Sequence, residues 1–166
     1  MAAKQVIPYD SVGAGKRAVV FIHGFLDAGN VWNPVIDKLN GNDWRKISLD
    51  LPGMGRLGKV ADKLSLEYLA DAVTGIVDDL ALPVVLVGHS MGTQVAELVA
   101  RARPRQTEGM VLLTPIPLAG LPVPQEIASA MRALGGDEAA QRELRRQLSP
   151  GLDASRLELL VQNGMG

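Results

Sequence analysis

A serine stands at the centre of a Gly-X-Ser-X-Gly pentapeptide, residues 88–92, where an apolar run meets an amphipathic segment. The run before it, residues 84–87, is apolar and mostly β-branched, which is typical of a strand buried on both faces. From Thr93 onward, apolar residues recur at helical spacing. A strand that turns directly into a helix crowds its own backbone, and a glycine two residues to either side of Ser90 relieves that crowding. The spacing therefore predicts a sharp bend that presents the Ser90 hydroxyl beside a helix N-terminus, where developing negative charge is favoured.

This strand–turn–helix context is that of a nucleophile elbow. In such a bend Ser90 would attack a carbonyl carbon and form an acyl-enzyme. The alternative interpretation is a glycine-rich turn that packs a helix closely against a sheet without any catalytic role.

Composition limits the classes of protein that the chain can belong to. Its 166 residues, 47% of them hydrophobic and 21% charged, suit one globular domain. A net charge of −1 gives no reason to expect nucleic acid or an anionic membrane as a partner, and the absence of cysteine excludes disulfides and thiolate metal sites. The first ten residues lack the apolar core of a signal peptide and no apolar run could span a bilayer, so we expect a cytoplasmic protein.

Strands and helices alternate in the hydrophobic pattern around the serine bend. The expected strands are residues 5–12, 18–22, 45–49, 84–87 and 109–113, and the expected helices are residues 31–39, 66–80 and 93–103. Pro8 confines the first strand to an edge, and Ser65 is predicted to cap the second helix. In the first helix four side chains are expected to share one inward face: Trp32, Val35, Ile36 and Leu39. Helices of this length between strands predict right-handed crossovers and a parallel sheet covered on both faces.

After Thr114 the pattern changes to a proline-punctuated passage and then to three short helical segments without strands between them. Asp137 and Asp153 are predicted N-caps of the last two segments. Apolar stripes mark the three segments: Ile127, Met131 and Leu134; Leu144 and Leu148; Leu157, Leu160 and Val161. Such stripes usually mean packing. The sharper alternative is a helical cap over the active site, whose underside would line a substrate pocket. The apolar and small residues of this cap suggest a modest, mainly hydrophobic acyl or aryl group: Ile116, Leu118, Ala119, Leu121 and Val123.

Three motifs in this order and spacing resemble the α/β-hydrolase superfamily: His23-Gly24-Phe25, residues 50–55 (Asp-Leu-Pro-Gly-Met-Gly) and the serine pentapeptide. The nearest match is its esterase, lipase and carbon–carbon hydrolase branch. The resemblance implies an α/β fold with a doubly wound, mostly parallel sheet that reaches the strand after the elbow helix, without the C-terminal strands. It also implies that residues 1–115 form the N-terminal part of the hydrolase core and residues 116–166 a helical cap segment.

The resemblance assigns roles to particular residues. Ser90 is the nucleophile, and the backbone N–H groups of Phe25 and Met91 form the oxyanion hole. Losing one such donor costs about 3 kcal/mol of transition-state stabilisation. The supporting residues of these two motifs are His23, Gly24, Gly88, His89 and Gly92.

A serine nucleophile also needs a general base, usually a histidine oriented by a carboxylate. The chain has only two histidines, and in this superfamily the acid and the base follow the elbow. His89 is directed differently from Ser90, and His23 is expected to brace the oxyanion loop. Asp27 and Asp50 are expected to brace loops as well. We therefore expect an N-terminal portion of an enzyme that ends inside the cap and is inactive alone, and a second chain or a swapped copy over the open edge of strand 109–113.

Two classes of function follow from these residues. One is a serine hydrolase acting on a small hydrophobic ester or acyl substrate. The other is a non-catalytic α/β-hydrolase-like binding protein or pseudoenzyme. Haloperoxidase, perhydrolase or lyase chemistry at the same site is not separable from hydrolysis by sequence. No cofactor or metal is expected, because two separated histidines make no ligand set and residues 52–58 match no phosphate or dinucleotide motif.

Overall fold

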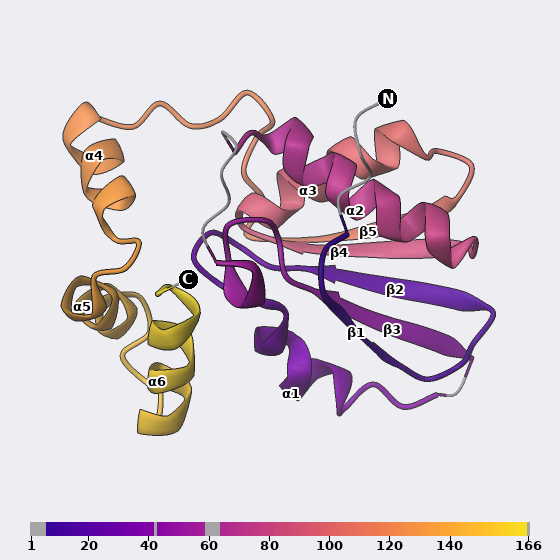
Figure 1. Ribbon diagram of the computed structural model, residues 1–166, viewed down its shortest axis with the longest axis horizontal. Coiled ribbons are helices and arrows are strands. Elements are labelled where there is room, and N and C mark those ends of the chain that lie inside the picture. Colours follow the sequence, from indigo (N-terminus) through magenta and orange to yellow (C-terminus); the bar gives the residue numbers. More distant parts are fainter. Residues whose placement is uncertain (1–5, 42, 59–63, 166) are drawn as a thin grey trace.

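The computed structural model of the protein describes residues 6–41, 43–58 and 64–165. This part of the chain forms one five-stranded sheet of order β1-β3-β2-β4-β5, in which only β1 is antiparallel to its neighbour (Figure 1). The strands are β1 (Tyr9–Val12), β2 (Arg17–Ile22), β3 (Trp44–Leu49), β4 (Val84–His89) and β5 (Thr107–Leu113). The predicted α/β class and the edge position of the first strand are confirmed, although that strand begins only at Tyr9 and Gln5 lies outside the described residues.

Each face of the sheet has its own core. Helices α2 (Leu66–Leu80) and α3 (Met91–Ala102) cover one face, where alternate residues such as Val20 and Leu86 are fully buried. Period-two alternation sends the next residues, Phe21 and Val87, to the other face, where they pack against Trp32 and Ile36. The predicted doubly wound arrangement follows from these two apolar faces.

The first helix is shorter than predicted. A 3-10 turn (Gly29–Trp32) leads into a single α-helical turn, α1 (Asn33–Ile36). Trp32 and Ile36 are buried, but Val35 and Leu39 are 43% and 41% exposed, so the expected four-residue inward face is wrong. A 3-10 turn has about 3.0 residues per turn and an α-helix about 3.6, and the mixture rotates the later side chains off the face that uniform α-helical spacing predicts.

Strand β5 forms an open, apolar edge of the sheet in the described part of the chain. Its residues Met110, Val111 and Leu113 are 44%, 46% and 43% exposed. An exposed apolar edge strand favours pairing with another chain. Its coverage by a second chain or a swapped copy stays a prediction. Gel filtration should give a mass above that of the 17.6 kDa monomer; a monodisperse monomer with no other polypeptide would contradict it.

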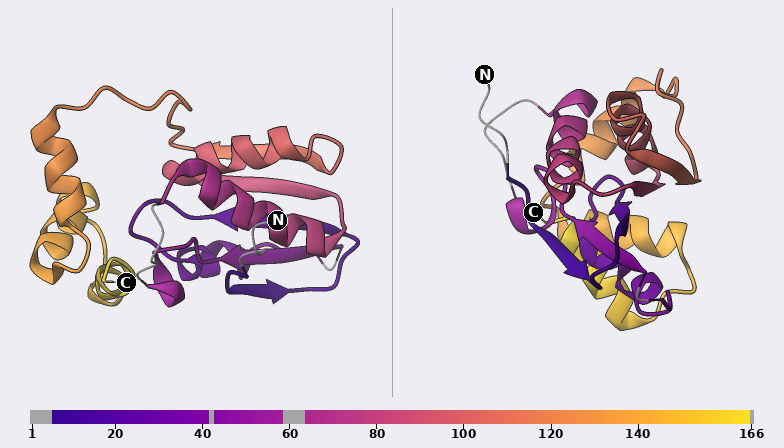
Figure 2. Two further views of the ribbon diagram at one scale, coloured as in Figure 1. Left: turned by 45° about the horizontal axis from the view of Figure 1, so that its top comes forward. Right: turned by 90° about the vertical axis from the view of Figure 1, so that its right-hand side faces the viewer.

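Three further helices follow β5: α4 (Gln125–Ala133), α5 (Glu138–Leu148) and α6 (Ala154–Asn163). They lie beyond the carboxyl ends of the parallel strands (Figures 1 and 2). The predicted N-caps are present: Ser65 Oγ accepts from Tyr68 N at 3.2 Å, and the Asp137 and Asp153 Oδ1 atoms accept from backbone N–H groups at 3.0 and 2.9 Å. The division of the chain at residues 115 and 116 stays a prediction.

These helices use their apolar stripes unequally. In α6, Leu157 and Val161 are buried, and α6 is joined to the core by the paired amides of Asn163 and Asn30, at 2.8 and 3.0 Å. The stripe on α4 does not pack: Ile127 is 50% exposed, because no element of the described chain covers that helix. Among the described residues, no helix has both the length and the hydropathy to cross a bilayer.

Candidate active site

Ser90 lies in the bend between β4 and α3 that the sequence predicts. Its backbone has φ 53° and ψ −122°, a strained conformation for a residue with a side chain. Two donors from Thr93, the backbone N and Oγ1, hold the Ser90 carbonyl at 2.9 and 2.6 Å, and Ser90 N donates to Leu113 O at 3.0 Å. The bend is thus fixed both by the first turn of the helix and by the neighbouring strand.

The two glycines of the pentapeptide permit close backbone contacts. A Cβ on Gly88 would lie 2.5 Å from Gly92 O, and a Cβ on Gly92 would lie 2.4 Å from Ile22 O and 2.6 Å from His23 O. Both distances are far below van der Waals contact. The predicted relief of crowding is confirmed, and Gly92 also brings the start of α3 against the end of β2.

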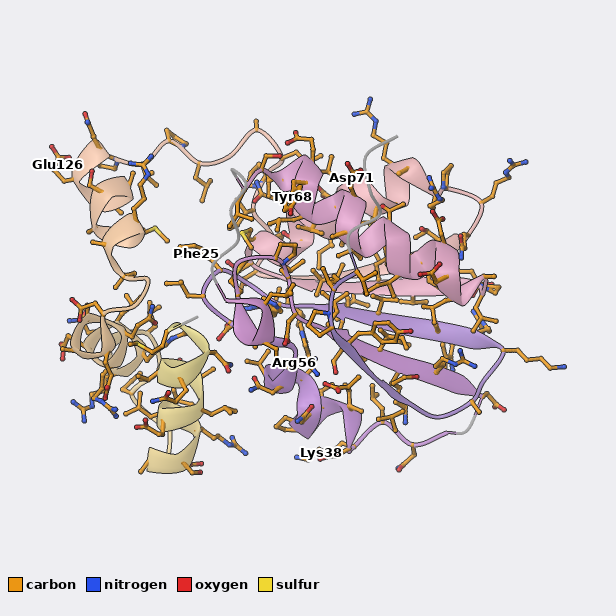
Figure 3. The ribbon with its side chains drawn as sticks, in the orientation of Figure 1. Phe25, Lys38, Arg56, Tyr68, Asp71 and Glu126 are labelled. Atoms are coloured by element: carbon orange, nitrogen blue, oxygen red, sulfur yellow. The ribbon has the colours of Figure 1, made fainter. Side chains whose placement is uncertain are left out.

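The loop after β2 lies directly beside Ser90. A Cβ on Gly24 would be 3.3 Å from Ser90 Cβ, so the loop approaches the bend as closely as a glycine allows. Phe25 is 40% exposed and points to the edge of the core that faces α4–α6 (Figure 3). Phe25 and Met91 line one small cavity of about 220 Å³. Within the described residues, neither the Phe25 nor the Met91 backbone N–H donates a hydrogen bond. Their place in an oxyanion hole stays a prediction.

His23 is fully buried and braces this loop. Its Nε2 accepts from Leu51 N at 3.0 Å, so its Nδ1 carries the proton and donates to Gly24 O at 2.8 Å. The imidazole therefore joins the loops that follow β2 and β3. Both ring nitrogens are thus occupied by backbone groups of these loops. The supporting role of His23 in catalysis stays a prediction.

The burial of His23 makes stability depend on pH. Burial lowers the pKa of its imidazole below the ordinary 6.5, although the hydrogen bond to Gly24 opposes this. Between about pH 6.5 and the lower pKa of the folded state, the unfolded chain binds a proton that the folded chain does not. The free energy of unfolding therefore falls as pH drops through this range, and His23 does not change it above about pH 6.5. Urea unfolding at about pH 5.5 and about pH 7.5 should show a loss of up to about 1.4 kcal/mol per pH unit. His23→Gln, which cannot take a proton, should lose less; an equal loss in both proteins would contradict this assignment.

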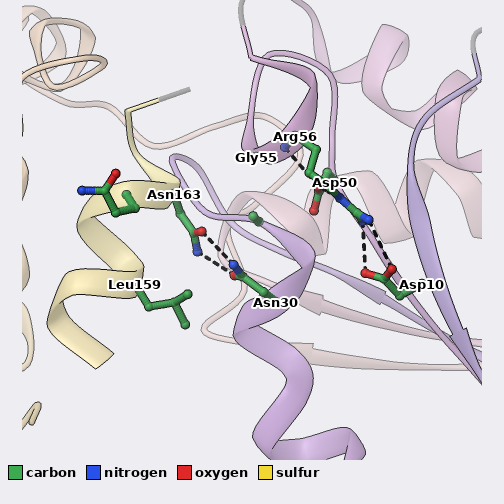
Figure 4. Close-up of a pocket in the computed structure, with 9 residues that line it drawn as sticks. Asp10, Asn30, Asp50, Gly55, Arg56, Leu159 and Asn163 are labelled. Atoms are coloured by element: carbon green, nitrogen blue, oxygen red, sulfur yellow. Dashed lines mark hydrogen bonds and ion pairs between the residues drawn. The ribbon is translucent and has the colours of Figure 1, made fainter. Parts of the chain in front are cut away.

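Asp50 braces the next loop along the sheet edge. Its Oδ1 accepts from Gly29 N at 2.7 Å, and its Oδ2 accepts from Arg56 N and Nε at 3.1 and 2.6 Å. Burial alone would raise the pKa of this carboxyl, but the Arg56 and Gly29 donors together hold it below its usual range. Arg56 also pairs with Asp10 at 3.1 Å beside a polar cavity of about 360 Å³ (Figure 4). The predicted bracing role of Asp50 is confirmed by these contacts.

An arginine that sequence reasoning missed joins α5 to the loop after β2. Arg145 Nη2 donates to Leu26 O at 2.6 Å and lies 3.2 Å from Asp27 Oδ1. Leu26 has φ 58°, in the left-handed region that residues with a side chain rarely adopt. Arg145 and Leu26 are 119 positions apart in the sequence. No local pattern marks Arg145, and only the packing of α5 reveals it.

A cavity of about 630 Å³ lies between the bend and helices α5 and α6. It is lined by His89 and Trp32 on the core side and by Arg145, Leu148 and Leu160 on the helical side. None of residues 116–123 lines this cavity. Gln94 Nε2 donates to Pro117 O at 2.7 Å, and Thr93 Oγ1 accepts from Ile116 N at 3.1 Å. These two hydrogen bonds hold the start of the segment after β5 against α3.

In the chain as described, no three His, Asp or Glu side chains gather as a metal site would require. Ser90 Oγ makes no hydrogen bond to either histidine in the same residues.

Known proteins resemble the chain in both sequence and structure. The model of the Alpha/beta hydrolase family matches residues 19–162. The non-heme chloroperoxidase CPO-A1 of Kitasatospora aureofaciens is 35% identical over 111 residues, which cover 66% of this chain and 40% of that protein. An esterase from Exiguobacterium antarcticum superposes with a TM-score of 0.76 at 17% identity, covering 95% of this chain and 63% of that one. Est816, described as an N-acyl homoserine lactone degrading enzyme, gives a TM-score of 0.73 at 26% identity and coverages of 95% and 61%.

The chain spans 7%, 29% and 37% of the lengths of three other curated relatives.

Proposed function

Because the chain belongs to the alpha/beta hydrolase family, we propose that it is the part of a serine hydrolase that carries the nucleophile Ser90 and the oxyanion hole. The substrate in this proposal is a small hydrophobic ester or related acyl compound. The observation that carries the proposal is the strained Ser90 bend beside two backbone N–H groups, those of Phe25 and Met91, that have no acceptor in the described residues. Esterases among the structural neighbours agree with hydrolysis in general.

The proposed reaction proceeds through an acyl-enzyme. Ser90 Oγ attacks the carbonyl carbon while a base takes its proton, and the carbonyl oxygen becomes an oxyanion that accepts from Phe25 N and Met91 N. Collapse of the tetrahedral intermediate returns the proton to the leaving alcohol and leaves the acyl group on Ser90. Water, activated by the same base, then releases the acid.

The base is the part of the mechanism that these residues do not supply. His23 uses both ring nitrogens for bracing, and His89 lines the neighbouring cavity without a hydrogen bond to Ser90 in the described chain. We place the base, and the carboxylate that orients it, outside these 166 residues. The lack of a base beside Ser90 is also the observation that favours the second candidate function, a ligand-binding pseudoenzyme.

Acylation can be tested on the chain as it stands. Imidazole in solution can replace a missing histidine base, so incubation with imidazole and p-nitrophenyl butyrate should release one equivalent of p-nitrophenol rapidly. Deacylation should be slow, because no positioned base activates water. Peptide mass spectrometry should then find the butyryl group on Ser90. A binding protein without catalytic function would bind the ester and leave Ser90 unmodified.

A further inference from the structure

Arg145 links α5 to the loop that carries Phe25. Its Nη2 donates to Leu26 O at 2.6 Å and lies 3.2 Å from Asp27 Oδ1. The side chains of Arg145 and Asp27 are only 13% and 9% exposed, so little water screens their charges from each other. Arg145 therefore contacts two neighbouring residues of the loop, one through its carbonyl and the other through its carboxylate.

Leu26 has a backbone conformation that its surroundings must enforce. Its φ of 58° lies in the left-handed region, which is unfavourable for a residue with a side chain and persists only where neighbouring groups hold it. Leu26 O accepts from Arg145 in this conformation, and the Leu26 side chain is buried. Without Arg145, one of the contacts that hold Leu26 is lost, and we expect its backbone to relax towards an ordinary conformation.

Phe25 lies between two anchored carbonyls. Before it, His23 Nδ1 donates to Gly24 O at 2.8 Å, and after it, Arg145 donates to Leu26 O. Because a peptide group is planar, the directions of the Gly24 carbonyl and the Phe25 N–H are linked. The Phe25 side chain is 40% exposed and contributes little to holding the residue. The direction of the Phe25 N–H thus depends on one anchor from the core and one from α5.

Helix α5 is itself held against α6. Gln141, one turn before Arg145, is fully buried, and a Cβ on Gly164 at the end of α6 would lie 2.4 Å from Gln141 Cδ. Helix α6 is in turn joined to the core by the paired amides of Asn163 and Asn30. The packing of these two helices therefore sets where the Arg145 guanidinium lies.

We propose that Arg145 is a positioning residue for the proposed acylation of Ser90. From α5 it holds the two residues after Phe25 and so keeps the Phe25 N–H directed at the bend. The catalytic consequence rests on the proposed function, but the hold on the loop does not. Misplacement of a reacting or stabilising group by about 1 Å can slow a reaction by about 100-fold. The loss of Arg145 should therefore lower the rate constant of acylation rather than the affinity for the ester.

The hold on the loop can be measured without catalysis. Arg145→Met keeps most of the apolar stem of the side chain and removes the guanidinium. Nitrogen-15 relaxation should then show the backbone order parameters of residues 25–27 falling from about 0.85 to below about 0.6. Arg142→Met, on the same helix but in exposed ion pairs with Glu138 and Glu158, should leave them unchanged.

A second variant separates the loop contact from general stability. Arg145→Met alone leaves the Asp27 carboxylate buried without its partner, which can destabilise the whole protein. Combining Arg145→Met with Asp27→Leu removes that charge as well, and urea unfolding shows whether each variant is folded. The double variant still lacks the donor to Leu26 O, so its loop should be as mobile as that of the single variant.

Acylation tests the catalytic consequence. With imidazole as the base, the saturating rate constant for acylation of Ser90 by p-nitrophenyl butyrate should fall at least about tenfold in both Arg145 variants, while the half-saturating ester concentration changes less than about twofold. The thiono ester, in which sulfur replaces the carbonyl oxygen, is the sharper comparison because sulfur is a weak acceptor. Losing an aligned donor slows the oxo ester more, so the ratio of the two rates should fall at least about fivefold. A fold that is merely less stable would slow both esters alike.

Order parameters that stay unchanged in both Arg145 variants would overturn the proposal, whether or not Ser90 is acylated. A mobile loop with an unchanged rate constant, or with an unchanged ratio of the two esters, would overturn it as well. If the unmodified chain is not acylated at all, the proposed function fails and the catalytic role of Arg145 fails with it. The order parameters then still decide whether Arg145 holds the loop.

Discussion

Ser90→Ala should abolish covalent acylation of the chain by p-nitrophenyl butyrate. Alanine keeps the size and position of the β-carbon in the bend but removes the only atom that can attack the ester there, so the imidazole-dependent burst should disappear. In the protein supplied with its histidine base, the same change should lower kcat by at least about 10⁴-fold. Stopped-flow release of p-nitrophenol measures the burst, and intact mass measures the adduct.

Ser149→Ala is the matched control for this loss. Ser149 is also a serine that lines the cavity beside the bend, but it lies just after α5 and not in the bend. Its burst should match that of the unmodified chain. An undiminished burst in Ser90→Ala, or an adduct that moves with Ser149, would refute Ser90 as the nucleophile.

Gly92→Ala should destabilise the fold by about 3 kcal/mol or more. Alanine is intrinsically better than glycine inside a helix by about 1 kcal/mol. At this position that gain is overwhelmed, because the new Cβ would lie 2.4 Å from Ile22 O and 2.6 Å from His23 O, and neither backbone oxygen can swing aside as a flexible side chain could. The free energy of unfolding from urea titration, followed by far-UV circular dichroism, gives the size of the effect.

Gly109→Ala provides the comparison, since a Cβ on Gly109 in β5 meets no atom within 4 Å. Its free energy of unfolding should stay within about 0.5 kcal/mol of the unmodified chain. If the two alanine variants were equally stable, the close contact between α3 and the end of β2 would not be required for the fold.

Local features of the fold were predictable from the sequence because neighbouring residues determine them. The Ser90 bend needs only a β-branched run, two glycines and a helical period, and all three are contiguous in the chain. The caps at Ser65, Asp137 and Asp153 depend on a side chain and a backbone N–H three residues apart. Alternation along the strands set which residues enter the two cores.

The tertiary structure decided whatever depends on residues far apart in the chain. It placed Arg145 on Leu26 and Asp27, put α5 and α6 rather than residues 116–123 around the large cavity, and left Ile127 on α4 exposed. Apolar spacing shows that a helix has a face to bury, but not which surface will meet it. Spacing therefore determined the nucleophile candidate, and the family resemblance its two expected amide donors. The lining of the large cavity was set by how the helices after β5 pack against the loops that follow β2 and β4.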